Sequence, residues 1–363
     1  MTVSSGKVLM IAYYFPPMAA AGSHRVMHFS RELQALAWDV SVVSTNDFRR
    51  NRIDPVLLER IPPEIQIRRA FSTDVVELLA RIKEGLKGKR NSDPGSRGDN
   101  SPAHARTPSK PVASGNGHAG LFDYLSRLMK TPDSMLSFIP SAVFRALPDM
   151  MGPRPDVIFS SAPPYSCHLA AFCLKSLFHV PWIADFRDPW AGNPFRANQR
   201  YPSLTALNRY LEGIVVQEAD QVICNTHALE KTFRTRYPHQ NHFVTLTNGF
   251  DPQLLERFSK QAASIPSGPE KKLCLVHTGE VYGLRSPHAL IDALGEIRRQ
   301  NAERFSLFRF SFYGKVDEQE ALENHARAEG VESAFHFGGQ VDHEEALKRC
   351  AESEMLLLLG VAG

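Results

Sequence analysis

The chain has 363 residues, 43% of them hydrophobic, and a net charge of +3 at pH 7. Its length exceeds that of one typical domain, so two domains are expected. No apolar run approaches the roughly 20 residues that a membrane-spanning helix requires. Residues 81–119 carry eight basic and three acidic side chains, so the positive charge is confined to one segment. This distribution excludes a broad basic face for nucleic acid.

The N-terminus and the cysteines indicate the compartment. The first residues lack the cationic and apolar pattern of a secretory signal, so we expect a cytoplasmic protein. Contact with the inner face of the plasma membrane is left open. The five cysteines are an odd number and form no C-x-x-C pair. They are therefore expected to be reduced thiols rather than disulfides or metal ligands.

Short apolar runs alternate with helical patterns from the N-terminus onward, which is typical of a parallel α/β sheet. The first helical pattern carries Val26, Phe29, Leu33 and Leu36 on one face. Seven runs predict strands that together make one doubly wound, Rossmann-like domain over residues 1–258. These runs are 8–13, 40–44, 65–70, 157–160, 181–184, 221–224 and 243–246.

Residues 85–120 interrupt this pattern. They are rich in Gly, Pro and Ser and lack apolar periodicity, so we predict a disordered insert. Gly115, Gly117 and Gly120 match G-x-G-x-x-G, but no strand precedes them and no helical pattern begins on them, so a dinucleotide site is not expected. The segment 121–147 has an apolar helical face that is expected to pack on the domain rather than to lie on a membrane.

A second α/β pattern follows a polar segment, 259–272, that is expected to be a linker. Ser286 before Pro287 predicts a helix N-cap, and Asp342 with Glu345 predicts a capping box. Four runs predict strands, at 273–277, 308–312, 334–337 and 355–359. Residues 271–363 are too few for a six-stranded nucleotide-binding domain, so this second Rossmann-like domain is expected to be truncated.

Charged residues directly follow one buried strand of the first domain. Asp185, Arg187 and Asp188 lie in the string I-A-D-F-R-D-P-W, where the strand ends. Ligands of open α/β sheets bind beyond the carboxyl ends of the strands, so this triplet is a candidate catalytic group. The alternative is an Asp–Arg salt bridge that only stabilises the loop.

Two further loops are candidate binding elements. Gly22 and Ser23 stand where the first loop enters its helix, and free amides at a helix N-terminus suit a phosphate. Asn248 and Asp251 follow the seventh strand and are candidates for lining the same cleft, although a plain turn would use the same residues.

Five ordered strings carry a family resemblance. Y-Y-F-P-P with G-S-H-R, P-D-V-I-F-S-S-A-P-P, P-W-I-A-D-F-R-D-P-W, T-N-G-F-D and H-T-G-E-V-Y-G-L-R resemble those of the group 1 and family 4-like glycosyltransferases of bacterial surface polysaccharide synthesis. The resemblance implies a GT-B fold of two Rossmann-like domains, with the acceptor mainly on the first and the nucleotide sugar mainly on the second. It also implies that Gly22 and Ser23 lie beside the donor diphosphate and Asp185 near the transferred sugar.

The resemblance extends to the second domain. It implies that Gly279 and Arg285 hold the diphosphate, and that the nucleoside lies against Gly314, Lys315, Gln340 and Val341. Glu280 departs from the family, where many members have Arg, so Lys315 is a candidate substitute cation. The acidic E-x7-E motif that would hold the donor ribose is absent, because the chain ends before it.

These features together predict a retaining, metal-independent hexosyltransferase that uses a nucleotide sugar, no cofactor, and a glycan or lipid-linked acceptor. Carboxylates such as Asp185 and Asp188 would orient sugar hydroxyls or assist loss of the acceptor proton, while Arg187 would hold the loop together. Two alternatives remain open at this point. One is a nucleotide-sugar epimerase of the same fold, and the other is a non-catalytic, truncated glycosyltransferase.

Overall fold

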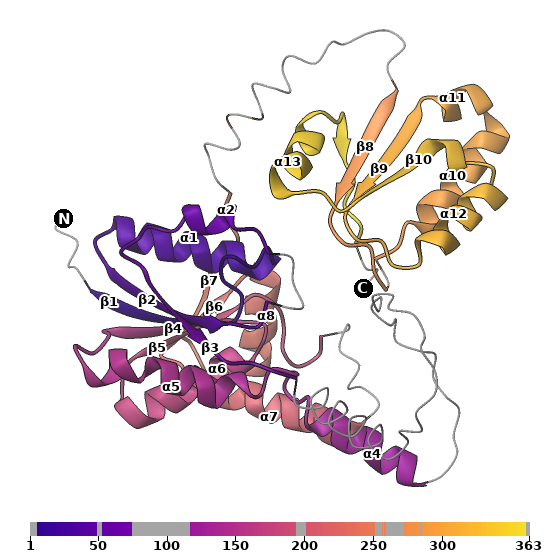
Figure 1. Cartoon of the computed structure of the whole chain (residues 1–363). Helices are drawn as coiled ribbons and strands as arrows, with labels where there is room; N and C mark the ends of the chain where they lie inside the picture. The colour runs from indigo at the N-terminus through magenta and orange to yellow at the C-terminus, as the bar shows by residue number, and fades with distance from the viewer. Residues whose placement is uncertain are drawn as a thin grey trace, which may run out of the picture. The chain divides into compact units, whose positions relative to one another are not determined.

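The computed structural model describes residues 6–48, 53–74, 117–193, 201–250, 256, 258, 272–283 and 285–360. The chain divides into two compact units, Met1–Gly249 and Phe250–Gly363. Each unit contains its own parallel sheet (Figure 1). The predicted linker before Lys272, residues 85–116 of the predicted insert and Asp251 lie outside the described residues.

The first unit is built on seven parallel strands in the order β3-β2-β1-β4-β5-β6-β7. All seven predicted strands are confirmed, with shifts of one or two residues at their ends. Because the strand order reverses between β1 and β4, the switch point of a doubly wound sheet lies there. The strands are β1 (Lys7–Ala12), β2 (Asp39–Thr45), β3 (Gln66–Ala70), β4 (Val157–Ala162), β5 (Trp182–Phe186), β6 (Gln221–Cys224) and β7 (Phe243–Thr245).

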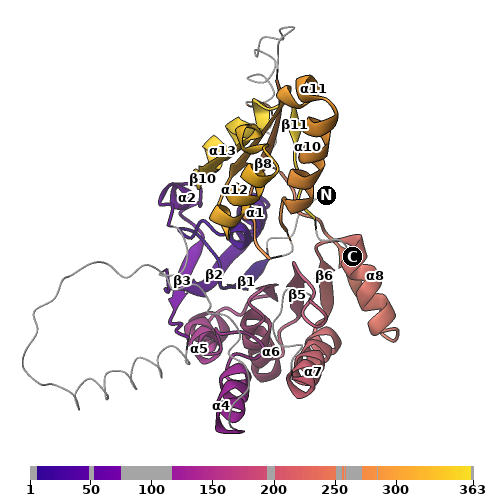
Figure 2. The same cartoon turned by 90° about the vertical axis from the view of Figure 1, so that its right-hand side faces the viewer.

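Helices cover both faces of this sheet (Figure 2). Alternate residues of β1 divide the core: Leu9 and Ile11 pack toward α5, α6, α7 and α8, whereas Val8 and Met10 pack toward α1 and α2. This two-sided burial explains why the strands are continuous apolar runs in the sequence. The helices are α1 (Ala21–Ala35), α2 (Val56–Glu59), α4 (Gly117–Leu128), α5 (Phe138–Met151), α6 (Ser166–Phe178), α7 (Pro202–Glu218) and α8 (His227–Arg236).

Two sequence predictions for these helices are wrong in part. Leu36 was placed on the buried face of α1, but α1 ends at Ala35 and Leu36 is 51% exposed. The predicted disordered insert was extended too far, because Gly117–Gly120 form the first turn of α4. Tyr124 of α4 packs edge-on against Tyr201, whose hydroxyl donates to Asp123 at 2.6 Å.

The second unit has a four-stranded parallel sheet in the order β10-β9-β8-β11. Its core gathers Ile291 and Leu294 of α10, Leu322 of α12 and Phe310 and Phe312 of β9. The elements are β8 (Leu273–Thr278), α10 (His288–Gln300), α11 (Ala302–Ser306), β9 (Phe308–Tyr313), α12 (Gln319–Ala328), η2 (Glu332–Ala334), β10 (Phe335–Gly339), α13 (His343–Ala351) and β11 (Met355–Leu356).

Local signals in the second unit are only partly confirmed. The Asp342 side chain accepts from the Glu345 amide at 2.8 Å, so the predicted N-cap is present, but the Glu345 carboxylate pairs with Arg349 at 2.7 Å instead of completing a capping box. Ser286 is not the N-cap of α10; Pro287 takes that position, and the Ser286 hydroxyl contacts the ring of His288 instead. β11 is also shorter than the predicted 355–359. All five cysteines are free, and among the described residues no helix is long and apolar enough to cross a membrane.

A buried histidine lies in the core beneath the sheet of the first unit. His168 of α6 is fully buried beside Phe186 and Trp182, and its Nδ1 is 2.8 Å from the Ser160 hydroxyl. The same hydroxyl accepts from the Trp182 indole at 2.7 Å. Burial, with a smaller contribution from the charge of Arg187, lowers the pKa of His168 to about 3. His168 is therefore neutral in the folded protein.

Acidification should destabilise the first unit through His168. In the unfolded chain the imidazole gains a proton near its ordinary pKa of about 6.5, whereas the folded protein resists protonation down to about pH 3, so the free energy of unfolding falls as the pH drops below about 6.5. We expect a loss of about 2 kcal/mol between pH 7 and pH 5 that is absent in His168→Gln. Denaturant unfolding can be followed by tryptophan fluorescence, because Trp38, Trp182 and Trp190 all lie in this unit. Parallel pH curves for the two proteins would contradict this assignment.

Candidate active site

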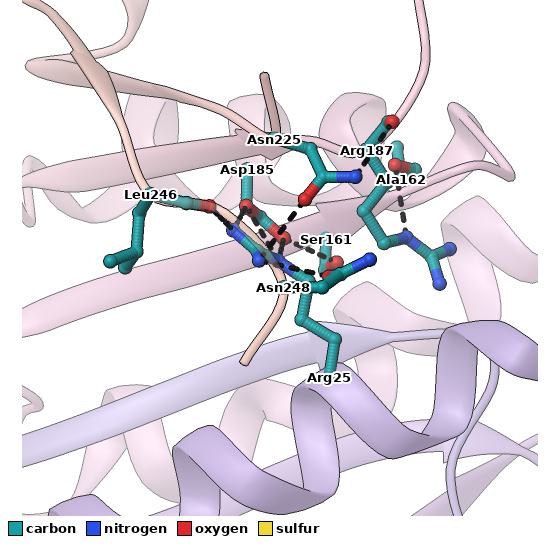
Figure 3. A network of polar contacts seen from close by, with 8 residues as sticks. All are labelled: Arg25, Ser161, Ala162, Asp185, Arg187, Asn225, Leu246 and Asn248. Carbon is teal, nitrogen blue, oxygen red and sulfur yellow. Dashed lines mark hydrogen bonds and ion pairs between the residues drawn. The ribbon is translucent and has the colours of Figure 1, made fainter. Parts of the chain in front are cut away.

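The carboxyl ends of the strands in the first unit bring several of the predicted residues together. Gly22 and Ser23 open α1, Asp185 belongs to β5, and Arg187 and Asp188 follow β5. Asn248, after β7, reaches the same group of side chains (Figure 3). These residues follow the carboxyl ends of strands of one parallel sheet.

Arg25 and Asp185 form the centre of this group. The Arg25 guanidinium donates to both Asp185 oxygens, with Nε at 3.0 and 3.2 Å and Nη2 at 2.8 Å from the carboxylate (Figure 3). The Ser161 hydroxyl adds a further bond to Asp185 at 2.7 Å. Both charged side chains are almost completely buried. Asp185 is therefore part of an ion pair, but its partner is Arg25 rather than Arg187.

Arg25 also connects three strand ends. Its Nη2 donates to the Leu246 carbonyl at 2.7 Å, and its Nη1 donates to Asn248 at 3.1 Å and Asn225 at 3.4 Å. Sequence reasoning missed the roles of Arg25, Ser161 and Asn225. The strings G-S-H-R and S-S-A-P-P contained the first two, but nothing local indicates that they meet Asp185.

Arg187 links the loop after β5 to the loop after β4. Its Nε donates to the Ala162 carbonyl at 3.2 Å and its Nη2 donates to the Pro163 carbonyl. A Cβ at Gly22 would lie only 1.8 Å from Arg187 Nη1, so the absent side chain makes room for the guanidinium at the start of α1. Burial lowers the pKa of Arg187, and Asp185 and Asp188 oppose this shift. An arginine stays charged in such a setting.

Ser23 supplies an unused polar atom at the same place. It is 1% exposed, and its hydroxyl has no hydrogen-bond partner among the described residues. Ser23 lies in the first turn of α1, at the positive end of the helix dipole, although its own amide already donates to the Ala20 carbonyl at 2.8 Å. A hydroxyl, a helix N-terminus and the guanidinium of Arg187 together favour an anion.

Asp188 differs from Asp185 in its surroundings. It is exposed, and its carboxylate forms no hydrogen bond or ion pair with the described residues. The loop that carries it is nevertheless well anchored. Trp190 donates to Asn208 at 2.9 Å, the Ala191 amide donates to the buried Glu212 at 2.6 Å, and the Tyr165 hydroxyl donates to the Pro189 carbonyl at 2.9 Å.

In the second unit, glycines end three neighbouring strands. Gly279, Gly314 and Gly339 have φ values of 148°, 146° and 68°, which disfavour other residues. A Cβ at Gly314 would lie 1.9 Å from the Gly279 carbonyl oxygen, so the backbones touch directly. The sequence-predicted nucleotide-binding residues of this unit, Gly279, Arg285, Gly314, Lys315, Gln340 and Val341, all belong to the loops at this edge of the sheet.

The loops at this edge of the second sheet carry the charged residues Glu280, Arg285 and Lys315. Arg285 is exposed, with its guanidinium 5.5 Å from the centre of the Tyr282 ring. Lys315, the candidate substitute cation, forms an ion pair with Asp317 at 2.9 Å, which raises its pKa. Glu280 is exposed, and its negative charge also raises the pKa of Lys315. Arg285 and Lys315 are thus the two cations of these loops that the sequence analysis assigns to the diphosphate.

Among the described residues, one group could hold a metal ion, formed by Asp292, His325 and Glu329 on α10 and α12. The residues of this group are already paired. His325 Nε2 bonds Asp292 at 2.7 Å, and Glu329 pairs with Arg299 at 2.7 Å. The group lies on helices rather than at the strand ends where the candidate site is.

Sequence comparison identifies the family. A model of the glycosyl transferase 4-like domain matches residues 21–249, which is most of the chain. The chain belongs to this glycosyltransferase family. Among curated proteins no sequence match was found.

Solved structures share the fold. Sucrose-phosphate synthase from Thermosynechococcus elongatus has a TM-score of 0.58 at 13% identity, over 97% of this chain and 75% of the other. Anabaena HepE in complex with UDP-glucose has a TM-score of 0.54 at 12% identity, over 97% and 73%. The G117R mutant of S. aureus TarM, in complex with Fondaparinux, α-GlcNAc-glycerol and UDP, has a TM-score of 0.55 at 8% identity, over 97% and 80%. The glycosyltransferase thus has the expected α/β, GT-B fold.

Neutralising Asp185 should destabilise the first unit. Asp185→Asn keeps the shape of the side chain but leaves the Arg25 charge buried without a counterion, which costs about 3–5 kcal/mol. Asp188→Asn is the matched control, because this carboxylate is exposed and unpaired, and it should change stability by no more than about 0.5 kcal/mol. Denaturant unfolding monitored by tryptophan fluorescence measures both. Equal stabilities of the two variants would show that the ion pair is not what holds these strand ends.

Proposed function

We propose that this glycosyltransferase moves a hexose from a nucleotide sugar to a glycan or lipid-linked acceptor, with retention of configuration and without a metal ion or other cofactor. The setting would be surface polysaccharide synthesis in the cytoplasm, at the inner face of the plasma membrane. The observation that carries the proposal is the family match over residues 21–249, combined with an anion-binding arrangement at the start of α1.

The first unit would stabilise the negative charge that develops on the departing diphosphate. Arg187 lies against Gly22, and Ser23 offers an unused hydroxyl in the next position. Preorganised donors at the position where charge develops lower the barrier, because they need no reorganisation during the reaction. The anchoring of Arg187 to the Ala162 and Pro163 carbonyls provides this rigidity.

The two aspartates would have different roles. Asp185 is enclosed by Arg25 and Ser161, so it would act by positioning the strand ends rather than by contacting the sugar. Asp188 is the exposed carboxylate of the predicted catalytic group and would orient a hydroxyl of the donor sugar or of the acceptor. Asn248 lies within the Arg25 network and would shape the adjoining surface.

The second unit would bind the donor nucleotide. Its glycine strand ends present backbone rather than side chains, which permits close approach of a ligand. Arg285 and Gly279 would contact the diphosphate, while the loops at Gly314–Lys315 and Gln340–Val341 would contact the nucleoside. UDP and UDP-glucose bound to HepE support a nucleotide sugar as the donor.

A product assay tests the reaction. The protein is incubated with labelled UDP-glucose, GDP-mannose or ADP-glucose, with and without lipid-linked acceptors, and the products are separated. Acceptor-dependent transfer is expected. Release of an isomerised nucleotide sugar without acceptor would indicate an epimerase instead, and binding without turnover would indicate a non-catalytic protein.

Asp188→Asn should reduce transfer by at least tenfold, a loss of about 1.4 kcal/mol or more of transition-state stabilisation, without lowering stability. The reason is that Asp188 is exposed on an anchored loop at the carboxyl edge of the sheet. Asp39→Asn is the matched control, because Asp39 is a half-exposed aspartate at the start of β2, on the opposite edge of the same sheet. The initial rate of transfer is measured for all three proteins. Full activity of Asp188→Asn would remove this residue from the site.

Arg285→Ala should weaken binding of the donor's nucleoside diphosphate by about 1.5–3 kcal/mol, the range for a hydrogen bond to a charged group. Lys315→Ala should weaken it less, because Lys315 is held by Asp317. Titration calorimetry with the nucleoside diphosphate compares the variants with the wild type. A larger loss in Lys315→Ala would mean that this lysine substitutes for the cation that Glu280 replaces.

A further inference from the structure

A histidine at the end of β8 has one ring nitrogen without a partner. His277 is 8% exposed, and its Nδ1 lies 3.1 Å from the Leu357 carbonyl oxygen. A carbonyl oxygen can only accept, so Nδ1 carries the hydrogen and donates it. In the neutral ring, Nε2 is then a hydrogen-bond acceptor. Nε2 is buried and has no hydrogen-bond partner among the described residues.

The unpaired nitrogen is directed at the glycine end of the strand. A Cβ placed on Gly279 would lie 3.5 Å from His277 Nε2, and no other side chain is closer to that position. Gly279 itself is exposed. The absence of a side chain at Gly279 therefore keeps the position beside Nε2 free of a Cβ.

Other contacts fix the orientation of the ring. The Phe312 ring lies 5.8 Å from it on the neighbouring strand β9. The Gly279 amide donates to the Tyr313 carbonyl at 2.9 Å, so the backbone beside the ring is also held in place. A buried acceptor left unpaired costs about 1–3 kcal/mol. A ligand that provides the missing donor at this strand end would offset the cost.

We propose that His277 Nε2 accepts a hydrogen bond from a hydroxyl of the bound nucleotide sugar, which makes His277 a donor-binding residue of the second unit. This inference rests on the proposed function. A hydroxyl fits the lone pair of Nε2, whereas the phosphate oxygens of the diphosphate are acceptors and would be repelled by it. Ribose and hexose both offer hydroxyls, and the experiment below separates them.

The test compares three proteins with the wild type. His277→Phe keeps the ring and removes both nitrogens, His277→Gln keeps an acceptor near the position of Nε2, and His325→Phe is the same change on α12 of the same unit. Titration calorimetry is performed with UDP-glucose and with UDP. GDP-mannose and ADP-glucose, with their nucleoside diphosphates, are used in the same way if the wild type prefers them.

We expect His277→Phe to weaken binding by roughly five- to twentyfold, His277→Gln to restore most of the affinity, and His325→Phe to match the wild type. The thermal midpoint of His277→Phe should stay within a few degrees of the wild-type value. The substitution removes the hydrogen bond from Nδ1 to the Leu357 carbonyl, but it also removes the unpaired buried acceptor Nε2. Weaker binding of both UDP and UDP-glucose by His277→Phe would identify a ribose hydroxyl as the donor of the hydrogen bond. Weaker binding of UDP-glucose alone would identify a hexose hydroxyl.

Two results would contradict the proposal, and they are distinguishable. If a folded His277→Phe binds the nucleotide sugar as tightly as the wild type, the role of His277 is overturned and the proposed function stays intact. A wild-type protein that binds none of the nucleotide sugars would overturn the proposed function itself, and the role of His277 with it. If His277→Phe does not fold, His277→Leu takes its place as the folded variant without an acceptor. The proposal then requires His277→Leu to bind more weakly than His277→Gln, and equal affinity of the two would overturn it.

Discussion

The buried ion pair between Arg25 and Asp185 is the constraint on which the site in the first unit depends. Two charges without solvent are tolerated only when nearly every donor and acceptor is satisfied. Arg25 meets this condition by bonding Asp185 and the ends of β6 and β7, and Ser161 adds a bond to Asp185. The start of α1 is thereby fixed against β5, and the position of Gly22 beside Arg187 follows from it.

Buried polar atoms without a partner occur at the proposed ligand-binding edges and also elsewhere among the described residues, as at His168 Nε2 in the core of the first unit. In the first unit, Asp149 is buried but bonded to Ser41 and Arg68, whereas Ser23 at the start of α1 has an unused hydroxyl. In the second unit, His277 shows the same contrast at the end of β8. An unpaired atom therefore indicates binding only together with a second observation, such as the glycine beside His277 Nε2 or the guanidinium of Arg187 beside Gly22.

The sequence predicted what depends on local patterns. Strands buried on both faces appear as apolar runs, and the cap at Asp342 needs only residues three positions apart. It could not predict contacts between distant residues. Arg25 and Asp185 are 160 positions apart, so no local pattern links them, and the choice of Arg187 as partner for Asp185 followed from sequence proximity alone. Helix ends were also misplaced, at Leu36 and Ser286, because burial and ring contacts decide them.

Burial distinguishes the two aspartates near the end of β5, because Asp185 is buried and Asp188 is exposed. A carboxylate that already receives bonds from a guanidinium and a hydroxyl, as Asp185 does, has little capacity left for a substrate. An exposed carboxylate on a loop anchored by Trp190 and Tyr165, as Asp188 is, keeps its acceptors available while its backbone stays fixed. Preorganisation requires both properties at once. The buried aspartate therefore holds the strand ends, and the exposed one would meet a sugar hydroxyl in the function proposed above.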